Sequence, residues 1–423
     1  MAVDVAPPRT HGHGAQANDA HMVEQTTCCV VGGGPAGAVL ALLLARKGIA
    51  VTLLEAHKDW AREFRGNTIN PAVVQIMAEL GLAAQLLALP HAKIRNFTVQ
   101  TNSGPLTFAD FSRLKTRYPF IMMLPQARFL EFIVREAQRY PNFQLRMGAR
   151  VEGLIQEAGV TRGVRYRVDG QSHELRALLT IGADGRFSRV RRLAALTPVA
   201  TATPMDVLWF NLPRKADDPQ EGGAVFRFGR RSLVVMMDHG EYWQIGYIIA
   251  KGSYPHVRAA GLEQLRQQLA ELLPELHDRI DVIQDWQQGA LLSVESSCLE
   301  QWYRPGLLLI GDAAHVMSPI GGVGINHAIQ DAVVAANVLA APLKSGNVRL
   351  RDLAAVQRRR REPTRVIQFF QRCMQRWGVD GVLQSNKPFR LPAFLRLGLR
   401  LPVVRAIPAW LIAFGAWPVH VKQ

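Results

Sequence analysis

The sequence has few cysteines and no long uninterrupted apolar run. Its four cysteines, two of them adjacent, provide neither a disulfide framework nor the spacing of a metal site, and they suit a reducing compartment. No apolar stretch reaches the roughly 20 residues that a membrane-spanning helix needs. Residues 1–25 lack the apolar core of a signal peptide, so we expect a disordered tail there. These absences favour a cytoplasmic protein, and 423 residues suffice for two or three domains.

Negative charge is scarce in the last fifth of the chain. The net charge is +16, and the segment from Lys344 to the end holds 16 Lys and Arg against three acidic residues. We expect residues 346–423 to form a basic, mostly helical C-terminal segment, in which 358–361 are four consecutive arginines. Two interpretations stay open: helices packed on the rest of the protein with a solvated basic face, or a peripheral contact with an anionic membrane. No nucleic-acid recognition motif accompanies the charge, so we expect no such partner.

The most informative motif present is a glycine-rich turn. Residues 32–37 read Gly-Gly-Gly-Pro-Ala-Gly, after an apolar, β-prone run and before a run rich in Ala and Leu. In a turn from strand to helix, Gly32 allows the tight bend and Gly34 lets a pyrophosphate approach the backbone. Gly37 lets the helix pack close to the strand. The motif predicts a dinucleotide site.

An acidic residue follows the turn at a suitable distance. The expected second strand, residues 50–54, ends in Glu55, which is 23 positions after Gly32. An acid at this point of a dinucleotide-binding unit meets a ribose hydroxyl. Glu55 therefore indicates an adenosine ribose without a 2′-phosphate, and it leaves NAD and FAD as alternatives.

Two further motifs follow expected strands. The first, residues 181–191, contains Asp184-Gly185, which alone would indicate only a turn. The second begins with an apolar strand that ends in Gly311-Asp312 and continues through a glycine-rich loop into a helix. A carboxylate at the C-terminal tip of a strand lies where doubly wound sheets bind ligands. The helix N-terminus beside it would stabilise negative charge.

In this order and spacing, the three motifs resemble those of the FAD-dependent aromatic hydroxylases of the p-hydroxybenzoate hydroxylase type, which include the ubiquinone-biosynthesis hydroxylases. The resemblance covers roughly residues 26–345. It implies an α/β fold with a Rossmann-like FAD-binding domain and an inserted antiparallel-sheet substrate domain. We expect the discontinuous FAD-binding domain to comprise 26–93, 125–200 and 290–345. The substrate domain would comprise 94–124 and 201–289.

The resemblance also implies the residues that hold FAD. The glycine-rich turn would bind the pyrophosphate, and Glu55 the adenosine ribose. For Arg65 a surface ion pair is the alternative to a place beside the flavin, and for Gln126 a plain helix cap is the alternative to a cofactor contact. We expect His315 to support the site from behind rather than to react. The implied cofactor-binding residues are Gly32, Gly34, Pro35, Ala36, Gly37, Glu55, Arg65, Gln126, Asp184, Asp312, Pro319, Gly322, Gly324, Ile325 and Asn326.

The activity that the resemblance implies is an FAD-dependent monooxygenation. NADPH or NADH would reduce the flavin, O₂ would add to give a C4a-hydroperoxide, and an aromatic, quinone or polyketide-like molecule would be hydroxylated. No second glycine motif marks a separate NAD(P)H domain. A phenolic substrate also has to lose a proton. Tyr242, Tyr247 and His239 lie in the β-rich region 205–250, and nothing in the sequence selects among them.

Two alternative functions stay open, and a third is disfavoured. A flavin-dependent reductase or oxidase of a lipid or quinone keeps the fold and changes the reaction. A non-catalytic flavoprotein held at a membrane would explain the basic C-terminal segment. A flavin halogenase is disfavoured, because the WxWxIP signature is missing and the nearest run, residues 242–246, lacks the second Trp and the Ile-Pro.

Overall fold

The structure is a computed structural model that describes residues 23–61, 66–101, 104–218, 223–229, 231–384, 397–399 and 401–422. The predicted disordered tail 1–25 lies outside these residues except for its last three, which begin strand β1 (Val23–Val31).

A mainly parallel sheet carries the three sequence motifs. β1 lies between β2 (Val51–Leu54) and β11 (Gln171–Gly182), and β20 (Leu307–Leu309) pairs in parallel with the end of β11. Parallel strands end at the same edge, so the motifs that follow β1, β11 and β20 meet there. The sheet is completed by β8 (Phe143–Arg146), β9 (Arg150–Glu157), β10 (Val160–Val168) and β19 (Tyr303–Arg304).

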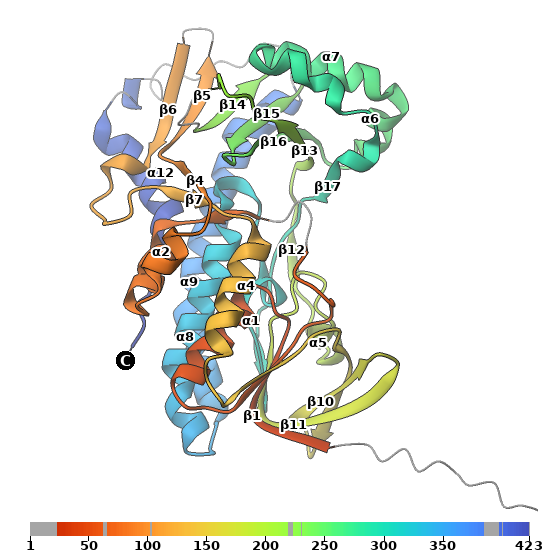
Figure 1. Ribbon diagram of the computed structural model, residues 1–423, viewed down its shortest axis with the longest axis vertical. Helices are drawn as coiled ribbons and strands as arrows, with labels where there is room; N and C mark the ends of the chain where they lie inside the picture. The colour runs from red at the N-terminus through yellow and green to blue at the C-terminus, as the bar shows by residue number, and fades with distance from the viewer. Residues whose placement is uncertain are drawn as a thin grey trace, which may run out of the picture.

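Long helices pack beside this sheet. α1 (Pro35–Arg46) contacts α4 (Gln126–Ala137) and α8 (Gly324–Lys344), and α8 in turn contacts α9 (Leu350–Met374). Figure 1 shows these helices running lengthwise together. α1 is rich in Ala and Leu and is buried over almost its whole length, which explains its close approach to the strands.

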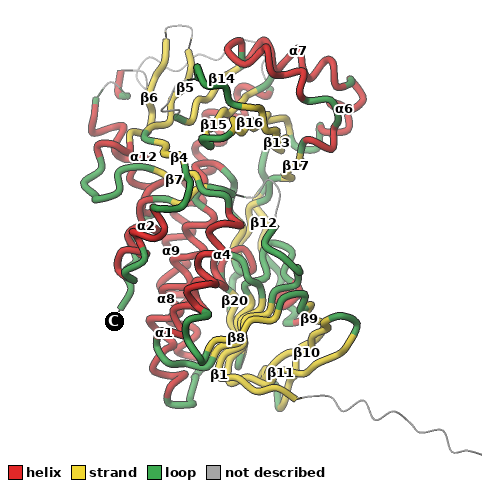
Figure 2. The backbone as a smooth tube through the Cα atoms, in the orientation of Figure 1, coloured by secondary structure: helices red, strands yellow, loops and turns green. Residues whose placement is uncertain are grey.

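A second sheet lies at the other end of the molecule (Figure 2). Its neighbouring strands are antiparallel except β5 and β14, which run parallel, so the sheet predicted to be antiparallel is mixed at this one pair. β5 comes from an earlier segment of the chain than the other central strands, so no hairpin joins it to β14 and the antiparallel direction is not imposed. In order across the sheet the strands are β17 (Ala290–Ser293), β13 (Met205–Pro213), β16 (Tyr242–Ala250), β15 (Leu233–Asp238), β14 (Ala224–Phe228), β5 (Asn96–Thr101) and β6 (Gly104–Asp110).

The two faces of this second sheet pack differently. On β16, Trp243, Ile245 and Tyr247 join the apolar core beneath α7 (Leu262–Leu272). The alternate positions of β16 face the opposite side, as the two-residue period of a strand requires. α7 ends at Leu272. A 3₁₀ segment begins at Pro274, whose ring and missing N–H do not allow the helix to continue.

Short elements join the two large sheets. The two small sheets consist of β3 (Thr68–Ile69), β7 (Ile121–Met123) and β4 (Ala92–Ile94), and of β12 (Val199–Thr201), β18 (Ser296–Cys298) and β21 (His315–Val316). The short helices and turns are α2 (Pro71–Glu79), α3 (Ala83–Leu87), α5 (Arg189–Leu193), α6 (Tyr254–Ala260), α10 (Gly381–Leu383), η1 (Phe111–Arg113), η2 (Pro274–Val282), η3 (Trp286–Gln288), η4 (Gly311–Ala313), η5 (Ile320–Gly322) and η6 (Gln375–Asp380).

The C-terminal helix returns to the junction of the two sheets. α12 (Pro402–Phe414) packs against β6 and α2 (Figure 1). The Asn70 side-chain amide donates to the Ile412 carbonyl at 2.5 Å, and the Gln330 amide donates to the Phe414 carbonyl at 3.1 Å. Among the described residues, no helix is both long and apolar enough to cross a membrane.

Candidate functional site

The glycine-rich turn has the geometry that its spacing predicts. Gly32 has φ +102°, and a Cβ on it would lie 2.5 Å from the Ala183 carbonyl oxygen. A Cβ on Gly37 would lie 1.9 Å from the Gly32 carbonyl oxygen. At Gly34, by contrast, a Cβ would meet no described protein atom within 4 Å. Gly32 and Gly37 therefore allow close packing of the backbone, and Gly34 leaves an open space at the N-terminus of α1.

Glu55 closes the same cradle from the end of β2. Its carboxylate is buried, and Oε2 accepts a 2.7 Å hydrogen bond from the Gly33 N–H. Oε1 accepts from the His57 N–H at 2.9 Å and lies 2.6 Å from His57 Nδ1. These contacts fix the carboxylate beside the cavity that the turn borders.

The second motif forms a loop that Asp184 and Arg191 hold together. Asp184 accepts from the backbone N–H groups of Arg189 at 2.7 Å and Val190 at 3.0 Å, so its carboxylate caps α5. Arg191 donates to the Ala313 carbonyl at 3.0 Å and thereby ties this loop to the third motif. Burial lowers the pKa of Arg191. Asp184 lines the cavity while its carboxylate faces α5.

The third motif places Asp312 and a glycine loop against the cavity. Pro319, Gly322, Gly324 and Ile325 line it together with Asp312. The loop then opens α8, whose first N–H groups have no partner within the helix.

The side chain of Asn326 points away from this cavity. Its oxygen accepts from the Asn70 N–H at 2.8 Å, and its amide donates to the carbonyls of Thr68 and Gly322. Gly322 itself has φ +61°, and a Cβ there would lie 2.6 Å from Thr68 Oγ1. Asn326 thus holds the loop in place, and only its backbone N–H belongs to the first turn of α8.

A buried charged network supports Gly311 and Asp312 from behind. Asp331 Oδ2 accepts from the Gly311 N–H at 2.9 Å and lies 2.6 Å from His315 Nε2. Arg360 Nε donates to Asp331 Oδ1 at 2.7 Å, and its guanidinium reaches His327 Nδ1 at 3.2 Å. Burial alone would raise the pKa of Asp331, but His315 and Arg360 outweigh it and hold that pKa below its usual range. His315 therefore occupies the supporting position expected for it.

Arg360 also changes the interpretation of the four consecutive arginines. Its exposed fraction is 0%, whereas Arg358 and Arg359 are exposed. One turn of helix α9 therefore presents two arginines to solvent and one to the interior. The sequence contained no signal for this difference except the helical phase of α9.

Gln126 and Arg65 were the other predicted cofactor contacts. Gln126 is the first residue of α4, makes no side-chain cap there, and lines the cavity. Its Oε1 is buried and has no hydrogen-bond partner in the described part of the chain. Arg65 lies outside the described residues.

The cavity bordered by these motifs has a volume of about 1530 Å³. Ligand pockets for one small molecule typically measure about 300–1,000 Å³, so this cavity accommodates a dinucleotide together with a second ligand. It extends from the three motifs to the inner face of the seven-stranded sheet. Its far end is walled by side chains of α9 and α12 that sequence reasoning did not single out, among them Phe370, Met374, Val404, Pro408 and Ile412.

None of the three residues weighed as a base lines this cavity. The Tyr247 hydroxyl donates to Gln268 Oε1 at 2.6 Å on the opposite face of the sheet. Tyr242 stacks on His239 with ring centroids 4.7 Å apart. His239 reaches the cavity only through Gln244, whose Oε1 lies 3.2 Å from His239 Nε2. Burial lowers the pKa of His239 to about 4, so the ring is neutral at pH 7.

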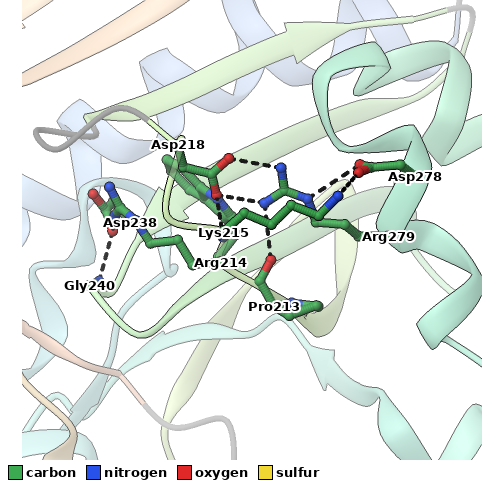
Figure 3. A network of polar contacts seen from close by, with 9 residues as sticks. Pro213, Arg214, Lys215, Asp218, Asp238, Gly240, Asp278 and Arg279 are labelled. Carbon is green, nitrogen blue, oxygen red and sulfur yellow. Dashed lines mark hydrogen bonds and ion pairs between the residues drawn. The ribbon is translucent and has the colours of Figure 1, made fainter.

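A network of ion pairs anchors the hairpin turn that carries His239 (Figure 3). Asp238 pairs with Arg214 and accepts from the Gly240 N–H at 2.7 Å. Close by, Arg279 donates to both oxygens of Asp218, at 2.5 and 2.8 Å. The contacts hold the loop after β13 against η2 and fix the end of the β15–β16 hairpin.

The residues of the cavity fit FAD. The open space at Gly34 and the first turn of α1 suit a pyrophosphate, and Glu55 lies where an adenosine ribose would follow. The buried Gln126 Oε1 is an acceptor that a hydroxyl or N–H of the cofactor would satisfy. The N-terminus of α8 suits the negative charge of a reduced flavin.

Comparison with protein families matches residues 25–369 to the family described as "FAD binding domain". The match spans all three motifs and the whole seven-stranded sheet.

Two curated relatives that cover most of this chain are named as monooxygenases. 6-Methylpretetramide 4-monooxygenase of Streptomyces rimosus is 34% identical over 80% of this chain and 81% of its own length. Para-nitrophenol 4-monooxygenase of Pseudomonas sp. strain WBC-3 is 28% identical over 78% of this chain and 82% of its own. The solved structure of PqsL, a probable FAD-dependent monooxygenase from Pseudomonas aeruginosa, superposes with a TM-score of 0.72. It is 20% identical, covers 85% of this chain and 97% of its own, and is similar in fold.

Proposed function

This chain belongs to the FAD binding domain family and is an FAD-dependent monooxygenase, and from that premise we propose that its substrate is a fused-ring aromatic molecule of polyketide type. The observation that carries the proposal is the apolar far end of the cavity. The described side chains that line it from β5, β6, β13 and β14 are all apolar or aromatic. A flat molecule with apolar faces matches such walls, and the S. rimosus relative is named for action on 6-methylpretetramide.

The residues of the chain have separate tasks in this reaction. We assign the glycine-rich turn and Glu55 to the adenosine diphosphate half of FAD, and Gln126 and Asp312 to the flavin half. Bound FAD supplies the redox chemistry, accepting electrons from NADPH or NADH and activating O₂ for transfer to the ring. The helix N-terminus at Gly324 stabilises negative charge, and the apolar walls exclude water from the reacting ring.

The test is product analysis with isotopic oxygen. Purified holoprotein is supplied with NADPH, ¹⁸O₂ and a panel of tricyclic and tetracyclic polyphenols. We expect substrate to accelerate NADPH oxidation, and the product to gain one ¹⁸O atom. Hydrogen peroxide is quantified in parallel to measure uncoupled turnover. A product that is reduced or dehydrogenated without ¹⁸O would instead assign a reductase or oxidase, and a protein that neither retains nor acquires FAD would overturn the enzyme assignment.

We also propose a peripheral contact with anionic lipid through α12. Val403 and Trp410 lie two helical turns apart on its outer side and are 75% and 38% exposed. α12 lines the cavity through Val404, Pro408 and Ile412, and Ile407 lies at the border between the cavity and this apolar face. The surplus of basic residues after Lys344 favours an anionic bilayer as the occupant.

The lipid proposal predicts co-sedimentation that depends on lipid charge. Full-length protein is mixed with vesicles of phosphatidylcholine alone or with 30% phosphatidylserine. We expect binding only to the anionic vesicles, and a loss of that binding in the variant Val403→Ser/Trp410→Ser. The matched control Val366→Ser changes an exposed apolar residue on α9. Equal sedimentation of the double variant and the wild type would contradict the proposal.

A further inference from the structure

The substrate end of the cavity contains no ionisable side chain on its described walls. The wall residues from β5, β6, β13, β14, β15 and β16 are apolar or aromatic except Gln244. Those from α9, η6, α10 and α12 are likewise without charge. The charged side chains that line the cavity lie at or beside its cofactor end: Glu55, Asp184 and Asp312 belong to the expected cofactor site, Arg150 comes from β9, and Glu295 lies near Arg191. A phenolic substrate bound against the sheet therefore meets no side chain there that could accept its proton.

Gln244 is oriented by its neighbour. It is 6% exposed and lies on the cavity face of β16, opposite to Trp243 and Ile245 in the outer core. The contact between its Oε1 and His239 Nε2 directs the carboxamide oxygen toward the hairpin. The contact with His239 is the one hydrogen bond that the Gln244 side chain makes to the described residues, so its amide nitrogen, which can only donate, has no partner among them. On the described walls the sheet thus carries two side-chain donors without a protein partner, the Gln244 amide and the buried indole N–H of Trp209, and the other side chains of the wall are apolar.

We propose that Gln244 binds an oxygen anion on the substrate, and that the enzyme selects molecules that are already ionised near neutral pH, such as enolised fused-ring polyketides. The inference rests on the proposed function and specifies its substrate class. Oxygen transfer to an aromatic ring requires an electron-rich ring, and an ionised hydroxyl provides one without a protein base. A donor N–H binds an anionic oxygen more strongly than a neutral one, because the hydrogen bond is charge-assisted.

His239 is a positioning residue in this arrangement. Its neutral ring stacks on Tyr242, and the Asp238–Arg214 pair anchors the hairpin that carries it (Figure 3). Further charged groups near the hairpin are the Asp218–Arg279 pair, which contacts Trp243 through Asp218, and Glu241 with Arg128 of α4, which lie 3.8 Å apart on the surface. Because His239 is uncharged above about pH 4, its titration does not contribute to substrate binding between pH 5 and 9.

The test measures binding of two probes to the FAD-loaded, full-length protein by calorimetry from pH 5 to 9. Alizarin has ionisable hydroxyls on a tricyclic quinone, and its dimethyl ether has none. We expect the affinity for alizarin to rise with pH as alizarin itself ionises, and the affinity for the ether to stay constant. A pH profile that is the same for both probes would overturn the proposal, because the pH dependence would then come from titration of a group of the protein. Failure of the wild type to bind either probe would also overturn it.

Three variants identify the donor. Gln244→Met keeps the length of the side chain and should lower the affinity for ionised alizarin about tenfold, the order of magnitude of one charge-assisted hydrogen bond. The affinity for the ether should change by less than about twofold. Gln244→Glu should lower the affinity for ionised alizarin further, because the introduced carboxylate repels the anion. The control Gln268→Met makes the same change on the outer face, beside Tyr247, and should leave both probes unaffected. Wild-type affinity of Gln244→Met for alizarin would overturn the assignment.

The role of His239 is tested by rescue. His239→Phe retains the stacking ring and removes the contact with Gln244, so alizarin affinity should fall while ether affinity is retained. His239→Asn retains a polar group near Gln244 and should restore part of the loss. Equal affinities of both variants would remove His239 from the proposal. Oxygen incorporation by the wild type is measured separately, so a failed binding prediction is distinguishable from a failed monooxygenase assignment.

Discussion

Replacing Arg360 with methionine is expected to lower the free energy of unfolding by about 3–5 kcal/mol, because it removes one partner of a buried ion pair. Arg360 and Asp331 are both fully buried, and their side chains are joined at 2.7 Å. Methionine fills much of the same volume but leaves the Asp331 carboxylate with less compensation in the interior. The loss exceeds that of most single substitutions, which cost about 0.5–3 kcal/mol.

The Arg360→Met prediction has a matched control in the adjacent residue. Arg359 is exposed on the same turn of α9, so Arg359→Met makes the same chemical change in solvent. Urea unfolding followed by tryptophan fluorescence should separate the two variants clearly, with Arg359→Met close to the wild type. FAD affinity should also fall in Arg360→Met, since Asp331 holds the Gly311 N–H beside Asp312. Superimposable unfolding curves for the two variants would contradict the role assigned to the network.

A double variant separates charge from packing. Asp331→Asn removes the carboxylate charge that Arg360 balances, so the combination with Arg360→Met should cost less than the sum of the two single changes. Asp331 also contacts His315 and Gly311, so the double variant should remain less stable than the wild type. Strict additivity would show that the two side chains do not interact energetically.

The buried arginine illustrates what the sequence could not supply. Four consecutive arginines identify a basic run, but the run does not indicate which of them is buried. That choice depends on the phase of α9 against α8 and on a carboxylate 29 positions earlier in the chain. Burial of a charge is favourable only with a partner, and the partner became visible only when the two helices were placed together.

The cofactor motifs were predictable because the conformation of each depends on residues that are close together in the sequence. The turn 32–37 specifies its own backbone geometry, and the parallel order of β1, β11 and β20 brings the motifs that follow them together. Even there the side-chain directions differed from the simplest expectation. Asn326 follows the glycine loop in sequence, yet its side chain holds β3 and the loop, away from the cavity. A motif predicts position along the backbone more reliably than the direction of a side chain.

The substrate end was hidden because it is assembled from distant segments. The role proposed for Gln244 depends on three features: strand alternation places it on the cavity face, His239 orients it across a hairpin, and the described cavity-lining residues of the surrounding strands carry no charge. α12 reaches the cavity from the far C-terminus, through contacts such as that between Asn70 and Ile412. Apolar residues in the basic segment therefore contribute to a cavity wall, which composition and charge did not predict.

The glycine-rich turn provides the second large prediction, which compares the same substitution at two positions. Gly34→Ala should leave the fold intact and weaken FAD binding by about 100-fold or more, equivalent to about 2.7 kcal/mol. Its φ of −70° is allowed for alanine, and no described protein atom lies within 4 Å of the added methyl group. The methyl group would occupy space into which a pyrophosphate has to approach.

Gly37→Ala should lower the stability of the fold, whereas Gly34→Ala should lower only the affinity for FAD. Alanine is favoured over glycine inside a helix by about 1 kcal/mol, so propensity alone predicts stabilisation. The added Cβ, however, would lie 1.9 Å from the Gly32 carbonyl oxygen, and both atoms belong to rigid elements. Separating α1 from β1 disturbs a tightly packed core, so we expect a less stable protein even without cofactor.

The two glycine variants are compared by melting temperature without FAD and by FAD dissociation constant from flavin fluorescence. Gly34→Ala should melt like the wild-type apoprotein, and Gly37→Ala should melt well below it. The control Gly48→Ala lies in the turn after α1 at φ +75°, with no described atom near its Cβ. It should cost stability modestly through backbone strain and leave FAD affinity unchanged, because it lies away from the cavity. If Gly34→Ala bound FAD normally, the pyrophosphate would not approach that glycine, and the cofactor assignment of the turn would have to be abandoned.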